Sequence, residues 1–316
     1  MITLAADVGG TRVKLGLVND MNIVARATIE ARSSEGLAQL LPRVAEEFKR
    51  LLDGAGLGFG ACEVFSVGFP SIVDAASGRI KATYGKYMDA LEIDLAAWTK
   101  EVFGLKFCIE NDARVALLGE WGRGAGMGCN NLVAVTLGTG LGTAALIDGN
   151  LLRGPHGQAG ILGGHVTVRF GGRLCSCGNR GCAEAEASTA VLEAIVREQP
   201  EYVGSRLSEV SRIDYAALFR LARAGDVCAA KVRERTIEVW AAMIVNLIHA
   251  YDPERVVVGG GILDGANDFL PDLVAKISGL AHTPWGKVDI RPALLGDDAA
   301  LIGCDLLARR RMFSNE

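Results

Sequence analysis

The sequence lacks the marks of a membrane, secreted or nucleic-acid-binding protein. Its 316 residues contain no run of 18 apolar residues, so no membrane-spanning helix is predicted. The first residues, 1–7, lack the basic segment and cleavage site of a signal peptide, and we therefore expect a cytoplasmic location. The 33 Lys and Arg are outnumbered by 37 Asp and Glu, giving a net charge of −4. Because this charge is negative and the basic residues are dispersed, we expect no nucleic-acid partner.

A P-loop motif, G-x-x-x-x-G-K-[ST], is also absent, which disfavours a P-loop NTPase. Histidine is scarce, with four residues, while cysteine and glycine are abundant, with eight and 40. Without a leader, the cysteines indicate reduced thiols in a cytosolic protein and not a disulfide framework. The glycines cluster in turns between apolar runs, which favours backbone held close to phosphate groups.

Three of the cysteines and one histidine form a compact group. Cys175, Cys177 and Cys182 fall within eight residues, and His165 lies ten residues before the first of them. One imidazole and three thiolates are a complete tetrahedral ligand set for structural zinc. The spacing therefore predicts a zinc loop over residues 165–182, although buried cysteines can also cluster by chance.

The N-terminal region has a turn suited to an anion. An apolar strand over residues 2–6 leads into Asp7, Gly9, Gly10 and Thr11, and a second strand follows over 12–18. Backbone N–H groups and a hydroxyl at such a turn suit phosphate, and the adjacent carboxylate suits Mg²⁺, directly or through water. An ordinary hairpin stays open as the alternative at this point.

Helices and strands alternate along the rest of the chain. Helical spacing of apolar residues begins near Ser33 or Ser34, either of which can cap the helix, and Pro42 either kinks this helix or begins its main part. Further helices are predicted over 113–121, 188–198 (capped by Ser188), 216–224, 229–250 and 299–311, and strands over 64–68, 107–109, 132–137, 144–147 and 255–258.

One of these strands is followed directly by polar residues. Glu110, Asn111 and Asp112 follow the strand at 107–109 and precede a helix. Ligands of open α/β sheets bind at the carboxyl ends of strands, so an amide and a carboxylate here are candidate ligand-binding groups. Both residues are also good helix N-caps, and the local pattern does not separate the two interpretations.

The second half of the chain repeats the strand–turn–strand layout. The strand at 132–137 is followed by a glycine-threonine turn over 138–143, with Gly138, Thr139 and Gly140, and by another strand. A triple glycine, Gly259, Gly260 and Gly261, later follows the strand at 255–258 and would let backbone approach an adenine–ribose group; a flexible turn is the alternative. Two such hairpins are typical of a duplicated fold that holds a nucleotide triphosphate in an interdomain cleft.

These motifs together resemble the ROK family of bacterial sugar kinases and sugar-responsive repressors, which includes glucokinase-, fructokinase- and N-acetylhexosamine-kinase-like members. The resembling stretches are D-x-G-G-T at Asp7, E-N-D-A at Glu110, C-x-C-G-x-x-G-C-x-E from Cys175, and D-P-E-x-x-V-x-G-G-G-I from Asp252. The resemblance implies an α/β fold of the two-domain actin-like ATPase (ribonuclease H-like) type with an interdomain active-site cleft. It places a small N-terminal domain over 1–112 plus about 299–316, and a larger C-terminal domain over 113–298.

The resemblance also implies an ATP-dependent sugar kinase that uses Mg²⁺ and structural Zn²⁺ and commonly forms homodimers. Asp112 would be the catalytic base for a hexose hydroxyl, by analogy the 6-hydroxyl. The sugar would be held by Gly68, Asn111, Asp112, His165 and Glu184. The nucleotide and Mg²⁺ would be held by Asp7, Gly9, Gly10, Thr11, Lys14, Gly138, Thr139, Gly140, Gly259, Gly260 and Gly261. The zinc ligands would be His165, Cys175, Cys177 and Cys182, with His165 also directed at the sugar.

Three other functions are alternatives to the kinase. A DNA-binding repressor of the same family would carry a winged-helix module before D-x-G-G-T, for which we expect no room ahead of Asp7. A zinc-finger nucleic-acid binder conflicts with the negative charge. A catalytically weak sugar-sensing protein conflicts with the retained Asp112 and both phosphate turns, and it stays open as the alternative.

One departure from the family concerns the sugar site. Family kinases read A-G-E-[IL]-G-H before the zinc loop, and their Glu accepts hydrogen bonds from sugar hydroxyls. This chain reads A-G-I-L-G-G-H, which is one residue longer and places Ile161 or Leu162 where the Glu would stand. Gln158 is the nearest polar replacement, Glu186 and the loop around Lys86 are more distant ones, and a backbone carbonyl is the remaining alternative. We therefore expect a poor glucokinase that prefers another sugar or sugar derivative.

Overall fold

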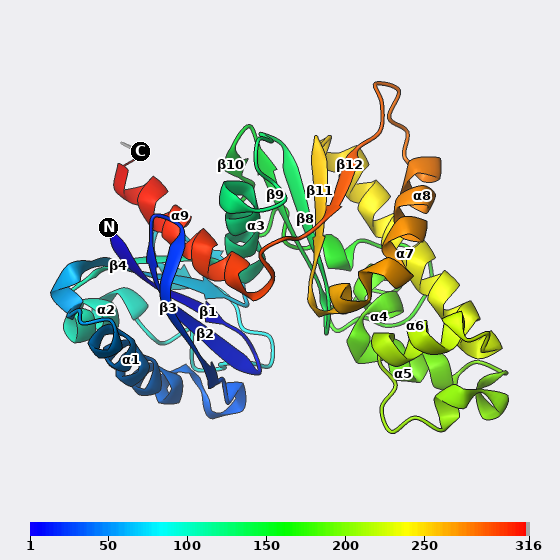
Figure 1. The fold of residues 1–316 in the computed structure, drawn as a ribbon, viewed down its shortest axis with the longest axis horizontal. Coiled ribbons are helices and arrows are strands. Elements are labelled where there is room, and N and C mark those ends of the chain that lie inside the picture. The colour runs from blue at the N-terminus through cyan, green and yellow to red at the C-terminus, as the bar shows by residue number, and fades with distance from the viewer. Residues whose placement is uncertain (314–316) are drawn as a thin grey trace. The chain divides into compact units, whose positions relative to one another are not determined.

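The computed structural model describes residues 1–313, so residues 314–316 of the predicted segment 299–316 lie outside the described residues. The chain divides into two compact units (Figure 1). Unit 1 contains Met1–Gly128, Leu151–Ala159 and the segment from Leu294 onward, and unit 2 contains Cys129–Asn150 and Gly160–Ala293. Along residues 1–313, no helix combines the length and the apolar character that crossing a bilayer requires.

Unit 1 is built on a five-stranded sheet. Its strands are β1 (Ile2–Val8), β2 (Arg12–Asn19), β3 (Asn22–Glu30), β4 (Cys62–Phe69) and β7 (Lys106–Asn111), in the order β3-β2-β1-β4-β7. The first three strands pair antiparallel, whereas β4 lies parallel to β1 and β7 parallel to β4. The carboxyl ends of β1, β4 and β7 therefore meet at one edge of the sheet. A two-stranded ribbon of β5 (Val73–Asp74) and β6 (Arg79–Ile80) follows β4.

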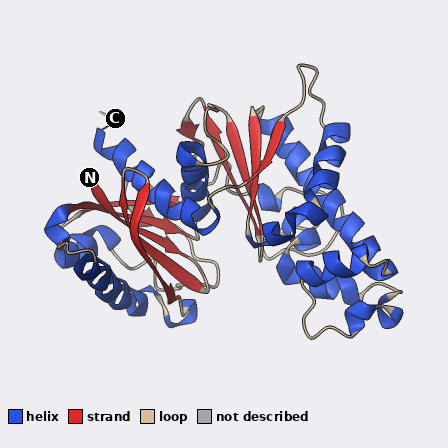
Figure 2. Ribbon diagram, viewed as in Figure 1, coloured by secondary structure: helices blue, strands red, loops and turns tan. Residues whose placement is uncertain are grey.

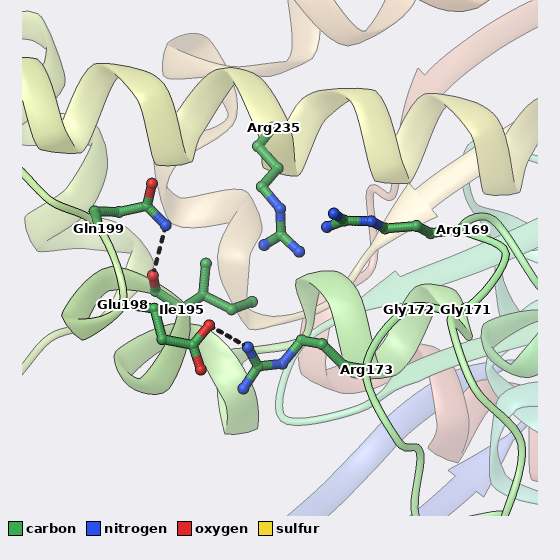
Figure 3. A pocket seen from close by; sticks show the side chains of 8 residues that line it. All are labelled: Arg169, Gly171, Gly172, Arg173, Ile195, Glu198, Gln199 and Arg235. Carbon is green, nitrogen blue, oxygen red and sulfur yellow. Dashed lines mark hydrogen bonds and ion pairs between the residues drawn. The ribbon is translucent and has the colours of Figure 1, made fainter.

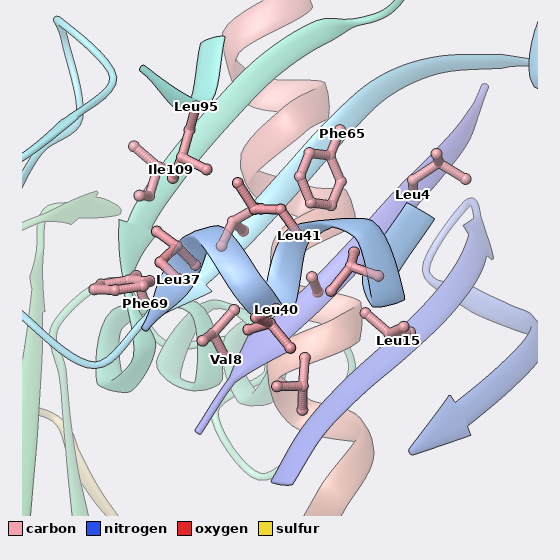
Figure 4. Close-up of a cluster of buried hydrophobic side chains, with 14 of the residues drawn as sticks. Leu4, Val8, Leu15, Leu37, Leu40, Leu41, Phe65, Phe69, Leu95 and Ile109 are labelled. Carbon is pink, nitrogen blue, oxygen red and sulfur yellow. The ribbon is translucent and has the colours of Figure 1, made fainter. Parts of the chain in front are cut away.

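One face of this sheet is covered by α1 (Leu37–Gly54), with α2 (Leu95–Phe103) nearby. Figure 4 shows the leucines of α1 directed at side chains of β1, β2 and β4. The buried residues of α1 recur at helical spacing: Leu37, Leu40, Leu41, Val44, Phe48 and Leu52. Neither Ser33 nor Ser34 caps this helix, contrary to expectation; the carboxylate of Asp89 accepts hydrogen bonds from the N–H groups of Leu37 and Ala38 at 2.6 and 2.9 Å. The helix runs through Pro42.

The other face is covered by α9 (Ala299–Phe313), which packs against β1, β4 and α3 (Asp112–Arg123). A Cβ atom on Gly119 would lie 1.9 Å from the carbonyl oxygen of Ala299, and one on Gly303 would lie 1.6 Å from that of Val115. The backbones of α3 and α9 therefore touch where both have glycine. This contact keeps α3 in unit 1, which extends to Gly128, whereas the predicted boundary lies at residue 112.

Unit 2 has a sheet with the same arrangement of strands. Its strands are β8 (Leu132–Leu137), β9 (Leu141–Ile147), β10 (Asn150–Leu151), β11 (Arg255–Gly259) and β12 (Asp289–Pro292), in the order β10-β9-β8-β11-β12. β8 and β9 pair antiparallel, while β11 lies parallel to both β8 and β12. The predicted turn at 138–143 is shorter than expected, because Leu141 and Gly142 already pair with Leu137 and Thr136 as part of β9.

The helices of unit 2 gather around α7 (Val227–Tyr251) (Figure 2). The others are α4 (Ala183–Ala187), α5 (Thr189–Arg197), α6 (Tyr215–Arg223) and α8 (Leu270–Leu280). The carbonyl oxygen of Ala187 accepts hydrogen bonds from the Trp240 indole at 3.1 Å and the Tyr215 hydroxyl at 2.8 Å, and both side chains are buried. The short helix α4 is therefore fixed to the core of unit 2 at its carboxyl end.

Most of the longer elements lie where the sequence predicts them. The elements that were not predicted are β3, β5, β6, β10, β12, α2, α4 and α8. Several of them are short, and β3 alternates exposed and half-buried residues. Ser188 occupies the N-cap position of α5, but its hydroxyl is buried without a hydrogen-bond partner among residues 1–313, so the expected side-chain cap is wrong.

Candidate active site

The carboxyl ends of the parallel strands of unit 1 bring four predicted residues together. Asp7 on β1 pairs in register with Gly68 on β4, and Phe69 of β4 pairs with Asn111 at the end of β7. A Cβ atom on Gly68 would lie 2.5 Å from Val115 Cγ2, 3.7 Å from Asp112 Cα and 3.8 Å from Asp7 Oδ1, so the glycine lets the start of α3 pack closely on β4 next to Asp7. This is the edge at which open α/β sheets bind ligands.

Asn111 is the N-cap of α3, one of the two roles that the sequence left undecided. Its Oδ1 accepts hydrogen bonds from the N–H groups of Ala113 and Arg114, which caps α3. Its Nδ2 donates to the carbonyl oxygen of Ser71 at 3.2 Å and to Oδ1 of Asp112 at 2.8 Å. The capping amide therefore also fixes the orientation of the Asp112 carboxylate.

The environment of Asp112 favours its protonated form. The pKa of Asp112 is raised to about 6, chiefly by burial and next by the neighbouring charge of Asp7, while the Ala113 N–H, Lys86 and Asn111 act in the opposite direction. A carboxylate with such a pKa is largely deprotonated at pH 7 and still basic enough to take a proton from an attacking hydroxyl. Its geometry and its pKa both suit a general base.

Asp7 is held beside a cation. Lys14, directly opposite on β2, lies 3.4 Å from Asp7 and 2.8 Å from Asp297, which the sequence analysis did not single out. Burial raises the pKa of Asp7, although the charge of Lys14 counteracts the rise. Lys14, which was predicted to contact the nucleotide, thus forms ion pairs with two carboxylates.

A loop from residue 82 to residue 90 supports the turn between β1 and β2. The Tyr87 hydroxyl donates to the Gly9 carbonyl oxygen at 2.7 Å, and the Ser33 hydroxyl donates to that of Gly10 at 2.8 Å. A Cβ atom on Gly10 would lie 2.6–2.9 Å from the end of the Lys86 side chain, so this lysine covers the turn. Sequence reasoning missed Tyr87, which is fully buried although the loop around it is polar.

In unit 2, the equivalent turn is held by α4. Glu184 Oε2 accepts a hydrogen bond from the Leu141 N–H at 2.9 Å, and a Cβ atom on Gly140 would lie 2.6 Å from the same oxygen. The Thr189 N–H at the start of α5 donates to the Gly138 carbonyl oxygen at 2.9 Å. The predicted phosphate turn and the predicted sugar ligand Glu184 are therefore in contact.

The triple glycine lies next to this turn. Gly260 has a φ of 97°, and a Cβ atom there would lie 2.2 Å from the Leu137 carbonyl oxygen at the end of β8. Only glycine fits this position, because both the backbone conformation and the space exclude a side chain. Gly259 ends β11, and Gly261 begins a 3-10 helix, Gly261–Asp268. The structure thus joins the predicted phosphate and adenosine segments within unit 2.

The four predicted zinc ligands converge. One ligand atom from each of His165, Cys175, Cys177 and Cys182 lies within 4.8 Å of all the others. The Cys177 and Cys182 sulfurs are 3.7 Å apart, and Cys175 Sγ is 3.5 Å from His165 Nδ1. Zn–S bonds of about 2.3 Å at tetrahedral angles place two sulfurs about 3.8 Å apart, whereas a disulfide would bring them to about 2.05 Å. The donor set fits a zinc ion, which His165 would bind through its Nδ1 nitrogen.

The segment that departs from the family motif is apolar. Ile161 is half-buried and the side chain of Leu162 is 40% exposed. The two glycines that follow pack closely on β9: a Cβ atom on Gly163 would lie 2.6 Å from Thr143 Oγ1, and one on Gly164 would lie 2.1 Å from the Leu141 carbonyl oxygen. The extra glycine therefore lets the loop lie directly on the strand.

Comparisons with known proteins agree with this arrangement. The chain is 30% identical to a glucokinase of Thermotoga maritima over 316 residues, which cover 98% of each protein. The structure superposes with a TM-score of 0.81 on a ROK hexokinase from Thermus thermophilus, at 28% identity and 99% coverage of both chains. It also matches a ROK-family glucokinase from Streptomyces griseus in complex with glucose and AMPPNP, with a TM-score of 0.78, 27% identity, and coverage of 98% of this chain and all of that one.

These likenesses cover 98–99% of the chain. The sequence model of the ROK family matches residues 3–311. With its ROK sugar-kinase fold of the actin-like ATPase type, this chain belongs to the ROK family.

Proposed function

We propose that this ROK protein is an ATP-dependent hexose kinase that transfers the γ-phosphoryl group to a sugar hydroxyl, the 6-hydroxyl by analogy. The observation that carries the proposal is Asp112, a carboxylate whose pKa is raised to about 6 and whose orientation is fixed by Asn111. In phosphoryl transfer the protein mainly positions the two substrates, neutralises charge on the phosphate groups and orients the nucleophile. Asp112 takes the proton of the attacking hydroxyl.

The nucleotide would be held by backbone groups of both glycine-rich turns. Gly9, Gly10 and Thr11 in unit 1, and Gly138, Thr139 and Gly140 in unit 2, offer N–H groups and hydroxyls to phosphates. Gly259, Gly260 and Gly261 would lie against the adenosine. This role is supported by the close approach of Gly260 to β8, which no side chain would permit.

Asp7 fits a role in holding Mg²⁺. It is a mostly buried carboxylate near Asp112, with Lys14 as its cationic neighbour. Oxygen ligands of this type suit Mg²⁺, which keeps several waters and binds through few carboxylates. When bound, Mg²⁺ neutralises charge on the phosphate groups. Lys14 holds the Asp7 carboxylate in position through their ion pair.

The zinc loop would position the sugar ligands of unit 2. His165 faces the other ligands through Nδ1, so Nε2 is the nitrogen that would contact a sugar hydroxyl. Glu184 follows Cys182 by two residues and is already oriented through its bond to Leu141. The zinc ion would thereby fix two sugar contacts by fixing the backbone on which they lie.

The identity of the sugar is the finer part of the proposal. Glu186 cannot replace the missing acceptor at residues 161–162, because it is fully buried and bound to Arg235 and to the Arg173 N–H. Gln158 is exposed and belongs to unit 1. A lost hydrogen bond to a charged acceptor weakens binding by roughly 1.5–3 kcal/mol. The enzyme is therefore a poor glucokinase and prefers a sugar that lacks or reorients the hydroxyl at this position.

A coupled ADP-release assay across hexoses, hexosamines and pentoses tests both parts. We expect ATP-dependent turnover with at least one sugar, and a kcat/KM for glucose below the best of the panel. Binding of sugar and ATP without turnover of any sugar would contradict the kinase and favour the sugar-sensing alternative. Glucose as the best substrate, with a kcat/KM of about 10⁴ M⁻¹s⁻¹ or more, would contradict only the substrate preference. The homodimer and the cytoplasmic location stay predictions of the sequence.

A further inference from the structure

Unit 2 contains a pocket that the proposed reaction does not use. It has a volume of about 420 Å³, and its walls come from the zinc loop, the end of α5 and the middle of α7. None of the predicted sugar, nucleotide or zinc ligands lines it. Figure 3 shows the ends of the Arg169 and Arg235 side chains directed toward each other, while Arg173, on the same side of the pocket as Glu198, is directed at that carboxylate.

The charges around the pocket are unbalanced toward positive. Two carboxylates face the three arginines: Glu186, which is fully buried, and Glu198, whose side chain is 59% exposed. Glu186 bonds Arg235, and Glu198 lies 2.5 Å from Arg173. The third guanidinium, that of Arg169, is 3.8 Å from Glu186 and 64% exposed. Three cations against two anions leave a net positive charge in a protein whose overall charge is −4.

The arginines are also close enough to repel one another. The pKa of Arg235 is lowered, chiefly by burial, and the charges of Arg169 and Arg173 lower it further. The backbone beneath them is tightly packed: a Cβ atom on Gly172 would lie 2.3 Å from Glu186, and one on Gly181 would lie 1.7 Å from the Arg169 carbonyl oxygen. The positive groups are therefore held together by the fold, and a bound anion would relieve their repulsion.

We propose that the pocket formed by Arg169, Arg173 and Arg235 binds the phosphate group of a small phosphorylated metabolite. Guanidinium groups bond phosphate oxygens with two parallel hydrogen bonds, and several of them around one space favour a dianion. The volume accommodates a sugar or nucleoside attached to the phosphate. The shared chemistry is a phosphate monoester or a terminal phosphate of a nucleotide; a hexose 6-phosphate and ADP are the two sources.

The pocket is connected to the proposed active site through α4. Glu186 on this helix binds Arg235 and the Arg173 N–H. Glu184, two residues earlier on the same helix, binds the Leu141 N–H at the predicted phosphate turn. An anion that draws Arg235 or Arg169 away from Glu186 weakens the ion pairs that hold Glu186, and with it α4, in place. The ligand therefore acts as a regulator of sugar binding, since Glu184 moves with the same helix.

Titration calorimetry on the full chain tests the site, with the active site first filled by a hexose substrate and a non-hydrolysable ATP analogue. Inorganic phosphate, a hexose 6-phosphate and ADP are titrated separately. We expect about one site per chain. A combined Arg169→Gln and Arg173→Gln variant should weaken binding at least tenfold, because each arginine supplies charge-assisted hydrogen bonds. Arg212→Gln removes one positive charge at an exposed arginine elsewhere in unit 2 and should leave the affinity unchanged.

The order of affinities distinguishes the sources, since the tighter of hexose 6-phosphate and ADP identifies the group attached to the phosphate. Thermal unfolding checks that the variants are folded, and Arg169→Gln alone, which removes the most exposed of the three arginines, serves if the combined variant is not. The absence of binding up to about 10 mM phosphate ester, or binding that is equal in the wild type and the arginine variants, would overturn the proposal. Because the readout is binding, neither result depends on turnover.

Discussion

Units 1 and 2 have the same sheet, with an antiparallel hairpin followed by parallel strands, but they carry different chemistry at equivalent positions. In unit 1 Asp7 pairs with Gly68, and in unit 2 Thr136 pairs with Gly259. The glycine on the neighbouring parallel strand is common to both, whereas the carboxylate occurs only in unit 1. The shared backbone thus makes two turns of the same kind, and only the turn of unit 1 follows a strand that carries a carboxylate at this position.

The additions to each sheet differ in the same way. In unit 1 the turn is supported by hydrogen bonds from Tyr87 and Ser33 and by the Lys86 side chain. In unit 2 the turn is supported by Glu184 on α4, directly after the zinc loop. Side chains from a neighbouring loop hold one turn, whereas the helix that holds the other begins directly after the candidate zinc ligands. This comparison predicts that catalysis depends on charges in unit 1, and that the geometry of the sugar site depends on metal in unit 2.

The largest expected effect is on the base in unit 1. Asp112→Asn should retain ATP binding and lower kcat by roughly 10²–10⁴-fold, because the amide cannot accept the hydroxyl proton. Its melting temperature at pH 7 should be unchanged or higher, since burial disfavours the charged carboxylate. Steady-state kinetics and thermal unfolding measure the two effects. Asp148→Asn, at an exposed turn of unit 2, is the matched control. Normal turnover in folded Asp112→Asn would remove the acid–base role from unit 1.

The next effect concerns zinc in unit 2. The purified protein should contain about one zinc per chain, and Cys182→Ser should lose it and raise the KM for sugar, because metal binding is also local folding energy. Metal analysis and kinetics would measure this. Cys228→Ala, a buried cysteine of unit 2 outside the ligand group, should keep the metal. Active, freshly purified protein without zinc would show that the loop stabilises itself without metal.

The helix contact in unit 1 should be sensitive to a single methyl group. Gly303→Ala should lower the free energy of unfolding by about 3 kcal/mol or more, because its Cβ would lie 1.6 Å from the Val115 carbonyl oxygen and α9 would have to shift. Gly279→Ala, on α8 of unit 2, has no atom within 4 Å of its Cβ and should stabilise by about 0.5 kcal/mol. Denaturant unfolding compares them. Equal effects would mean that the close approach of α3 and α9 is not required.

The smallest effect is the pH dependence. Because the pKa of Asp112 is raised to about 6, kcat/KM should be nearly constant above pH 7 and fall tenfold per unit below pH 6, as the base becomes protonated. The contribution of Asp112 to stability has the opposite trend: its raised pKa means that the folded state binds more protons, so this contribution decreases as pH rises from about 4 through 6. A rate profile that declines only below pH 4 would indicate a base in a more solvated environment.

The sequence alone determined the features that depend on short-range patterns. The zinc ligands were identified from spacing within eighteen residues, and the structure brings their ligand atoms together. The two strand–turn–strand hairpins and the long helix α7 were also predicted, because alternation and helical spacing of apolar residues are local properties. The residues at the ends of β1, β4 and β7 were identified singly, with the help of the family resemblance.

Only the tertiary structure decided what these residues do to one another. The pKa of Asp112 depends on burial and on Asp7, which lies 105 positions away in the chain. The cap of α1 comes from Asp89, and the capping hydroxyl expected at Ser188 has no partner within the described chain. The arginine pocket combines residues of the zinc loop and α7. Burial, electrostatic interaction and convergence of distant segments arise when the sheet and its helices pack, and no local sequence pattern encodes them.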